Sequence, residues 1–192
     1  MSEPDHGDPA GRGVGGAYPD GVVVQVAYLV EDLRQAALEF SRLTGAGPFF
    51  VVDHVATEWM FHPYRGADGA VEAVVDQSVA MGQWGPVQVE LIEYHRLEPE
   101  TVRAAFTAPG MGPHHVAWIV SDLDAEIERL AAAGATPIVE GATRQVRFAF
   151  FAQPGGGVLE CYQRDRPILD MYAMVRDAAA GWDGSDPVRS LR

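Results

Sequence analysis

The first strong hydrophobic pattern is an apolar run over residues 22–30. This run is rich in β-branched residues apart from Gln25, which predicts a strand covered on both faces. Beyond Asp32, apolar residues recur every three or four positions as far as Leu43, and this spacing predicts an amphipathic helix. Asp32 is a typical N-cap, and Gly45 is a typical residue at a helix C-terminus.

The same order of elements returns ninety residues later. A strand is predicted over 116–120, Asp122 is the expected cap of a second amphipathic helix, and Gly134 is its expected end. Gln25 and His115 hold equivalent places in the two repeats, since 115 − 25 = 90, and the two caps have the same spacing. A shared offset for strand, cap, helix and stop indicates an internal duplication.

Further strands follow each predicted helix, so each half reads β-α-β-β-β. The predicted strands are 49–55, 71–75 and 87–94 in the first half, and 136–139, 146–152 and 158–163 in the second. The expected fold class is therefore α+β. The expected domains are a flexible N-terminal tail (1–20), a first module (21–98), a second module (110–165) and a C-terminal helical extension (166–192).

The charge balance narrows the class of ligand. Fourteen Lys and Arg against 27 Asp and Glu give a formal charge of −13, and no basic cluster offsets it, so nucleic acid and anionic membranes are not expected partners. A small molecule is the expected ligand. The single cysteine, Cys161, excludes an intrachain disulfide, and the chain has neither a signal-peptide pattern nor a long apolar run, so a soluble cytoplasmic protein is expected.

Four polar residues interrupt otherwise apolar strands. They are Gln25, Glu90, His115 and Glu160, on the first and last predicted strands of each half. A buried polar side chain is costly unless it is paired, and two carboxylates, an imidazole and an amide oxygen can together hold a divalent cation. The alternative to a metal ligand, for each residue, is a side chain that lies at the edge of a sheet or is satisfied by hydrogen bonds.

Two other histidines, His54 and His62, are weaker candidates for metal binding. His54 and His62 lie between predicted strands and lack a second pair of ligands at any standard spacing, so the sequence does not predict a separate metal site there. Glu93 and His95 are expected to be solvated, and His114 is expected to point away from its neighbour His115.

The arrangement of these residues resembles the vicinal oxygen chelate superfamily, which includes glyoxalases, bleomycin-resistance proteins and extradiol dioxygenases. The resemblance covers about 22–163, and Gln25, Glu90, His115 and Glu160 fall in order on the four family ligand positions. It implies a curved, cup-shaped mixed β-sheet with flanking helices. It also implies a bound divalent metal, which is Zn, Mn, Ni, Co, Fe or Mg.

The resemblance further implies isomerase, epimerase or lyase chemistry beside a carbonyl, through a metal-stabilised enolate with Glu160 or Glu90 as proton carrier. Gln25 in place of a histidine disfavours a dioxygenase, and Leu29 and Tyr94 do not supply the cations that glutathione would need. The alternatives are a non-catalytic drug- or metabolite-binding protein and a metal-free cyclase that uses the same cavity.

Aromatic residues are the expected contacts for a largely hydrophobic substrate. The predicted substrate-binding residues are Trp59, Phe61, His62, Phe148 and Phe150. A homodimer is also expected, with the C-terminal extension as its contact and with the site either inside one chain or completed by a swapped subunit.

Overall fold

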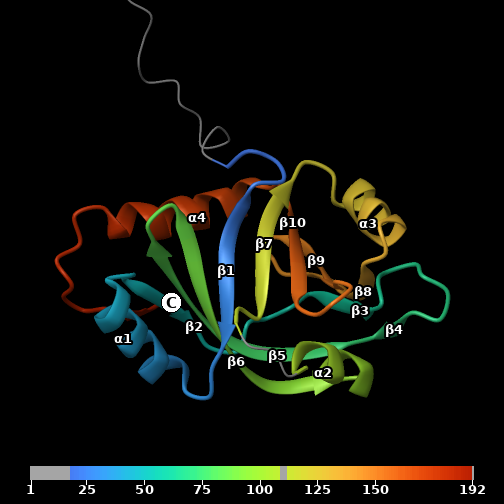
Figure 1. Ribbon diagram of the computed structural model, residues 1–192, viewed down its shortest axis with the longest axis horizontal. Coiled ribbons are helices and arrows are strands. Elements are labelled where there is room, and N and C mark those ends of the chain that lie inside the picture. Colours follow the sequence, from blue (N-terminus) through green and yellow to red (C-terminus); the bar gives the residue numbers. More distant parts are fainter. Residues whose placement is uncertain (1–17, 109–111, 192) are drawn as a thin grey trace, which may run out of the picture.

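The computed structural model describes residues 18–108 and 112–191, which form one open, strongly curved sheet of eleven strands with helices around it (Figure 1). The strand order is β11-β2-β5-β6-β1-β7-β10-β9-β8-β3-β4. The predicted α+β fold with a cup-shaped mixed sheet is confirmed. The elements are β1 (Val23–Leu29), α1 (Leu33–Thr44), β2 (Phe49–Val52), β3 (Trp59–His62), β4 (Val71–Glu72), β5 (Val74–Trp84), β6 (Val87–Glu98), α2 (Glu100–Phe106), β7 (His115–Val120), α3 (Leu123–Ala132), β8 (Thr136–Ala142), β9 (Arg147–Ala152), β10 (Val158–Gln163), α4 (Arg166–Ala179) and β11 (Val188–Ser190).

The two halves of the chain join at the centre of the sheet. β1 and β7 pair antiparallel, with Gln25 opposite Ala117 and Ala27 opposite His115. β1 also pairs in parallel with β6, and β7 pairs in parallel with β10. The first and last strands of each half are therefore the four central strands, and this neighbourhood brings their inward polar residues together.

Helices α1 and α3 cover the convex face of the sheet, one on each half (Figure 1). The predicted caps are present, because Asp32 accepts a hydrogen bond from the Gln35 amide and Asp122 accepts one from the Ala125 amide, each at 3.0 Å. Each helix also begins against the last strand of its own half. Glu93 accepts the first amide of α1, and Gln163 accepts the first amide of α3, so the duplication extends to the helix starts.

The C-terminal extension lies on the concave side of the sheet. The buried face of α4, which includes Ile168, Tyr172 and Val175, packs against the strands of the cup, mainly β5 and β6. The chain then adds the edge strand β11 beside β2, which the sequence did not predict. The flexible tail predicted for 1–20 falls mostly outside the described residues, and the described Asp20 pairs with Arg164.

Strand β5 is much longer than the strand predicted over 71–75. It runs antiparallel to β6 along the whole length of that strand, from Val74 to Trp84. In the sequence of β5, polar residues and Gly82 interrupt the alternation of apolar and polar positions by which a strand is predicted. Gly82 is required here because a Cβ atom at this position would lie 2.8 Å from the ring of Phe49.

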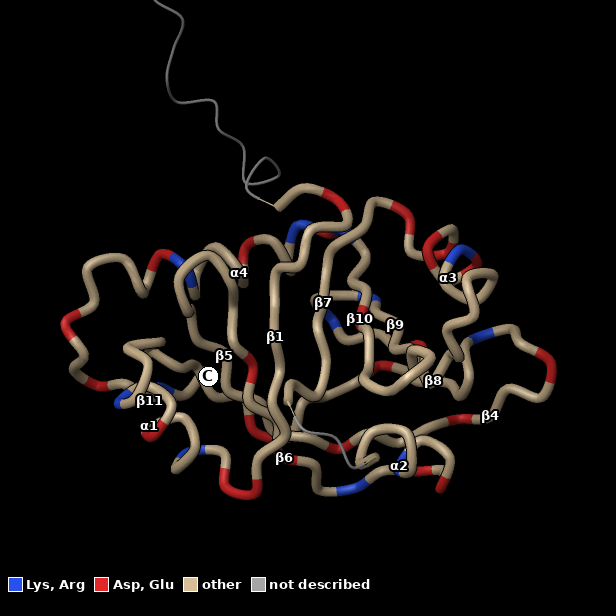
Figure 2. The backbone as a smooth tube through the Cα atoms, viewed as in Figure 1, with Lys and Arg blue, Asp and Glu red and all other residues tan. Residues whose placement is uncertain are grey.

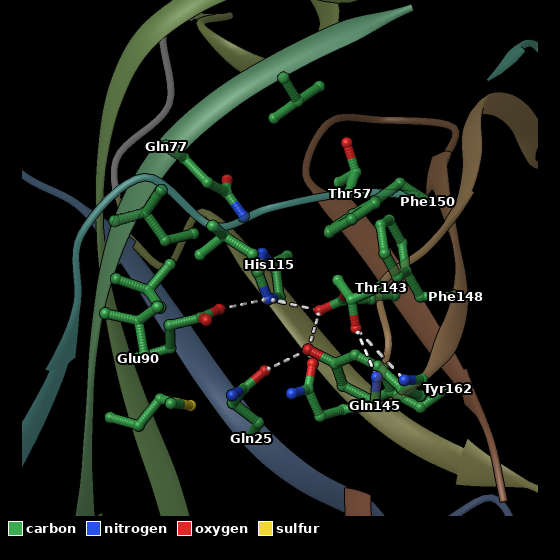
Figure 3. Close-up of a pocket in the computed structure, with 18 of the residues that line it drawn as sticks. Gln25, Thr57, Gln77, Glu90, His115, Thr143, Gln145, Phe148, Phe150 and Tyr162 are labelled. Carbon is green, nitrogen blue, oxygen red and sulfur yellow. Dashed lines mark hydrogen bonds and ion pairs between the residues drawn. The ribbon is translucent and has the colours of Figure 1, made fainter. Parts of the chain in front are cut away.

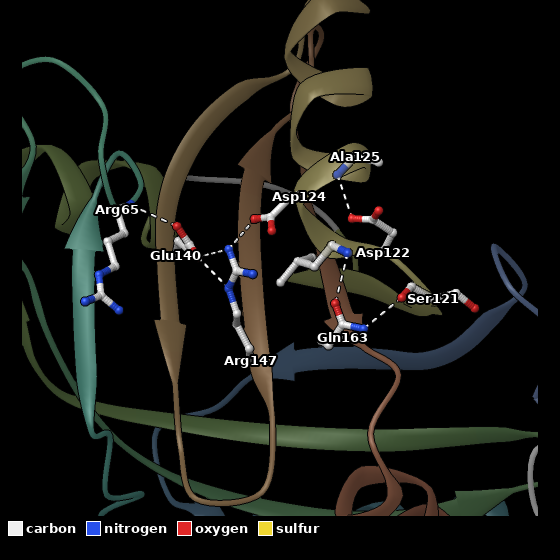
Figure 4. A network of polar contacts seen from close by, with 9 residues as sticks. Arg65, Ser121, Asp122, Asp124, Ala125, Glu140, Arg147 and Gln163 are labelled. Carbon is white, nitrogen blue, oxygen red and sulfur yellow. Dashed lines mark hydrogen bonds and ion pairs between the residues drawn. The ribbon is translucent and has the colours of Figure 1, made fainter.

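Strands β3 and β4 leave the first half and extend the edge of the second half, where β3 pairs with β8. A buried carboxylate on β8 holds the connection that follows β3 (Figure 4). Glu140 accepts the Arg65 amide at 2.9 Å and pairs with the Arg147 guanidinium, which also reaches Asp124 on α3. Glu140 therefore helps to hold strands β3 and β4, here called the β3–β4 arm, at the edge of the second half.

Charged residues are spread along the whole described chain. Asp and Glu occupy turns, strand ends and helices on every side, with basic positions between them (Figure 2). The charges of the described residues are therefore not gathered on one part of the fold.

Replacement of Glu140 by alanine should destabilise the fold. It leaves the Arg147 guanidinium without its buried partner, and the expected loss is about 2–3 kcal/mol, below the range for a fully buried pair because Arg147 is 32% exposed. The measurement is urea unfolding. The control Asp124→Asn, at a 73% exposed side chain, should cost about 0–1 kcal/mol. Equal losses in the two variants would contradict the role given to Glu140.

Candidate functional site

Three ionisable side chains from three of the central strands converge inside the cup (Figure 3). The Nε2 atom of His115 lies 3.0 Å from an oxygen of Glu160 and 3.5 Å from an oxygen of Glu90. One ligand atom from each residue lies within 4.8 Å of the other two. All three side chains are at least nine-tenths buried, so their charges interact with little screening by water.

Gln25 joins this cluster through a tyrosine. The hydroxyl of Tyr162 lies 2.7 Å from Glu160 and 3.2 Å from the Oε1 atom of Gln25, and its single hydrogen is shared between these two acceptors. On its other side, Gln25 donates its amide to Gln88 at 2.9 Å. Because Gln88 takes the NH₂ group, the carbonyl oxygen of Gln25 is the atom that faces the cluster.

A chain of hydrogen bonds determines which nitrogen of His115 carries a proton. The Phe106 carbonyl can only accept, so His114, which contacts it through Nε2 at 3.0 Å, is protonated on Nε2. The unprotonated Nδ1 of His114 then accepts from Nδ1 of His115 at 3.0 Å. His115 therefore directs the lone pair of Nε2 at the two carboxylates.

Burial shifts the pKa of every ionisable group in the cluster toward its neutral form. It raises the pKa of Glu90 to about 7, an effect that His115 opposes and Glu160 supports. It raises the pKa of Glu160 to about 8 against the hydrogen bond from Tyr162. It lowers the pKa of His115 to about 4, so this imidazole is neutral at pH 7.

The cluster fits a bound cation. The Nε2 atom of His115 is buried and has no hydrogen-bond partner among the described residues, although a carboxylate oxygen lies 3.0 Å away. A lone pair and a carboxylate oxygen repel each other at this distance unless a proton or a metal ion lies between them. Imidazole nitrogen, carboxylate oxygen and amide oxygen are suitable donors for a divalent ion.

The cluster lies in the wall of a cavity of about 430 Å³. The other walls are largely apolar and come from both halves of the sheet and from α4, which contributes Ile168 and Met171. Gln77 brings an amide into the cavity from β5 (Figure 3). Residues of both halves and of the extension therefore enclose a space suited to a small molecule.

The predicted substrate contacts divide into two groups. Phe148 and Phe150 line the cavity. Trp59 and Phe61 do not, because β3 alternates and turns Met60 inward between them. His62 is on the same face of β3 as Met60, but its ring is held by other groups and does not line the cavity. Trp59 instead lies beneath the guanidinium of Arg65. His62 bonds the Ile138 carbonyl and accepts from Thr101.

Three supporting residues were not found from the sequence. Gln88 and Tyr162 each lie two positions from a predicted ligand, hence on the same face of the same strand, and this spacing was the available signal. His114 was expected to point away from His115. The strand begins at His115, and His114 lies in the preceding loop with its ring turned back toward its neighbour.

Comparison with known proteins agrees with this architecture. The model of the glyoxalase/bleomycin resistance protein/dioxygenase superfamily matches residues 24–150. A curated relative from Actinomyces sp., named 2-epi-5-epi-valiolone epimerase, is 35% identical over 159 residues, which are 78% of this chain and 81% of the relative.

Solved structures with similar chains include methylmalonyl-CoA epimerase from Mycobacterium tuberculosis, at 21% identity and a TM-score of 0.46 over 80% of this chain and 94% of that one. A hypothetical protein from Bacillus halodurans is 14% identical, with a TM-score of 0.48 over 76% and 95% of the two chains. Within residues 18–108 and 112–191, no helix is long and apolar enough to cross a membrane. The family match and the curated relative show that the chain belongs to the glyoxalase/bleomycin resistance protein/dioxygenase superfamily and is an enzyme of it.

Proposed function

We propose that this enzyme is a metal-dependent epimerase that inverts one stereocentre beside the carbonyl group of a small ketone. The observation that carries the proposal is the convergence of Glu90, His115 and Glu160, with the imidazole lone pair aimed at two buried carboxylates. The curated relative is named 2-epi-5-epi-valiolone epimerase, and the ending -one in the name of its substrate denotes a ketone.

Gln25, Glu90, His115 and Glu160 would hold the metal. A divalent cation supplies a Lewis acid that stabilises negative charge on a carbonyl oxygen and so makes the adjacent C–H group more acidic. The identity of the ion is open among Zn, Mn, Ni, Co, Fe and Mg, because a mixed set of nitrogen and oxygen donors accepts several of them.

The two carboxylates would move the proton. Glu90 comes from the last strand of the first half and Glu160 from the last strand of the second, and both lie within 3.5 Å of His115 Nε2. Epimerisation removes a proton from one face of a carbon atom and returns one to the other face. A carboxyl group from each half would give one proton carrier per face.

The cavity favours a substrate that combines apolar and polar edges. Apolar side chains such as Met81, Phe148 and Phe150 would contact the carbon skeleton. Gln77 would bond a hydroxyl or carbonyl group, because a carboxamide both donates and accepts. We therefore take the relative's ketone, 2-epi-5-epi-valiolone, as the first substrate to test.

The direct test follows the proposed substrate by NMR in D₂O with metal-loaded protein. Inversion through an enolate should place deuterium on the carbon beside the carbonyl, and the metal-free protein should not catalyse the exchange. Methylmalonyl-CoA serves as a comparison substrate. Metal-loaded protein that binds the ketone but neither exchanges nor epimerises it would overturn the proposal.

Metal content provides an independent test. In untagged protein purified without chelators, the His115 cluster should carry one equivalent of a divalent metal that resists dialysis, as measured by plasma mass spectrometry, and His115→Ala and Glu160→Gln should lose this equivalent. The control Gln77→Leu changes a cavity residue outside the ligand set and should keep the metal. Equal metal content in His115→Ala and the wild type would exclude His115 as a ligand.

The orienting role of His114 predicts weaker metal binding in His114→Phe. This variant removes the acceptor for Nδ1–H of His115, and the expected increase in the metal dissociation constant is about 10–100-fold. Calorimetric titration measures it. His62→Phe, a histidine with two hydrogen bonds outside the cavity lining, is the matched control and should leave the constant unchanged.

The raised pKa values of Glu90 and Glu160 predict a pH dependence for the metal-free protein. Between about pH 6.5 and 8 the native state holds protons that the unfolded chain has lost, so stability should fall as pH rises, by at most about 1.4 kcal/mol per group for each pH unit. Metal displaces these protons, so metal binding should tighten over the same range. Below pH 6.5 the lowered pKa values of His114 and His115 act in the opposite direction and offset this fall in stability. Urea unfolding at pH 6.5, 7.25 and 8.0 measures the first effect. Glu160→Gln should reduce the slope, and an unchanged slope would contradict the assignment.

The homodimer expected from the sequence stays a prediction. Light scattering behind a sizing column measures the mass directly. The described cluster takes all four proposed ligands from one chain, so the proposed site does not require a swapped subunit.

A further inference from the structure

A second cluster of possible metal ligands lies on the first half of the chain, outside the cavity. His54 follows β2, Asp76 lies on β5 and His95 lies on β6, and one ligand atom from each lies within 4.8 Å of the other two. The neighbours Gln77 and Tyr94 line the cavity. Because successive residues of a strand face opposite sides, the cluster is on the reverse side of the cavity wall.

A β-bulge brings His95 to this position. The register between β5 and β6 shifts between Asp76 and Gln77, and His95 is the extra residue of β6 at the shift. Bulges re-aim side chains, and they are frequent beside functional sites. Here the bulge places the ring of His95 against the ring of His54, with centroids 4.5 Å apart and planes at 34°.

The backbone of His54 is fixed in an uncommon conformation. Its φ angle is +49°, in the left-handed region, which a residue other than glycine seldom adopts. The buried Ser78 holds it there, because its hydroxyl oxygen accepts the His54 amide at 3.1 Å and also contacts His95 at 2.8 Å. One buried hydroxyl thus positions both histidines before any ligand arrives.

The neighbouring arginines are paired with other carboxylates, so the carboxylate of Asp76 is available to a metal ion. Arg34 is engaged by Asp53 in a two-bond pair, and Arg96 is engaged in the same way by Glu98. The ion-pair partner of Asp76 among the described residues is His54, at 2.7 Å. A divalent ion that replaced the shared proton would bond both groups at once.

We propose that His54, Asp76 and His95 form a second site for a divalent transition metal, separate from the His115 cluster. Two imidazoles and a carboxylate suit Zn²⁺, Co²⁺, Ni²⁺ or Cu²⁺, and water completes the coordination because His54 is 65% exposed. Glu93 lies 3.8 Å from His95 and adds negative charge beside the site.

Binding here would brace the wall of the cavity. The ion would tie the connection between β2 and β3 to strands β5 and β6, and that connection carries Val55 and Thr57, which line the cavity. The ion is expected to stabilise the fold and to hold these two residues in place without contact with the substrate.

The experiment counts Zn²⁺ equivalents by calorimetry on the untagged, chelator-treated full chain and repeats the count with Co²⁺ by its visible absorption. The wild type should bind two equivalents. The double variant His54→Ala/Asp76→Asn should lose one, with at least a tenfold weaker dissociation constant for it, and should lose the rise in melting temperature caused by that equivalent.

A complementary variant separates this proposal from the proposed function. His115→Ala/Glu160→Gln should keep the outer equivalent, and adding His54→Ala and Asp76→Asn to it should abolish binding. The control Asp170→Asn, which changes an exposed carboxylate paired with Arg166 on α4, should bind like the wild type. If His115→Ala/Glu160→Gln binds no equivalent, or binds one that persists without His54 and Asp76, the outer site is refuted whatever the His115 cluster does.

Discussion

The rest of the structure depends on one unfavourable contact, the lone pair of His115 directed at two carboxyl groups with which it is buried. Such a contact persists only where the surrounding fold holds all three groups in place and a proton or cation lies between them. The fold meets the first condition with four adjacent central strands, of which β6, β7 and β10 supply these three groups and β1 supplies Gln25. Helices α1 and α3 cover the reverse side of these strands with apolar contacts.

The duplication gives equivalent positions but different chemistry. Gln25 and His115 occupy corresponding places on β1 and β7, and each is oriented by a neighbouring side chain of another kind. Gln88 takes the amide hydrogens of Gln25, whereas His114 takes the ring hydrogen of His115. In both cases the orienting partner selects the atom that faces the cluster. An internal pseudo-symmetric fold can therefore diversify its ligands while it keeps their placement.

The sequence predicted the duplicated framework and the central cluster because both repeat at one offset. Gln25, Glu90, His115 and Glu160 stood out because each interrupts an apolar strand. The arm of β3 and β4 was not predictable in this way, because its partner, β8, is far along the chain and pairing leaves little trace in local composition. Trp59, Phe61 and His62 were judged by residue type, whereas strand alternation decided that Met60 faces the cavity. The His54 cluster was hidden for a similar reason, since a bulge on β6 decides where His95 points.

The β3–β4 arm also affects how the molecule folds. Because residues of the first half complete the edge of the second, neither half holds all the hydrogen-bonded neighbours that it has in the whole chain. A fragment that ended at Glu98 would carry an arm without its partner strand, and the remaining fragment would expose the edge of β8 to aggregation. Because the arm of one half pairs with a strand of the other, we expect the two duplicated halves to fold as a single unit.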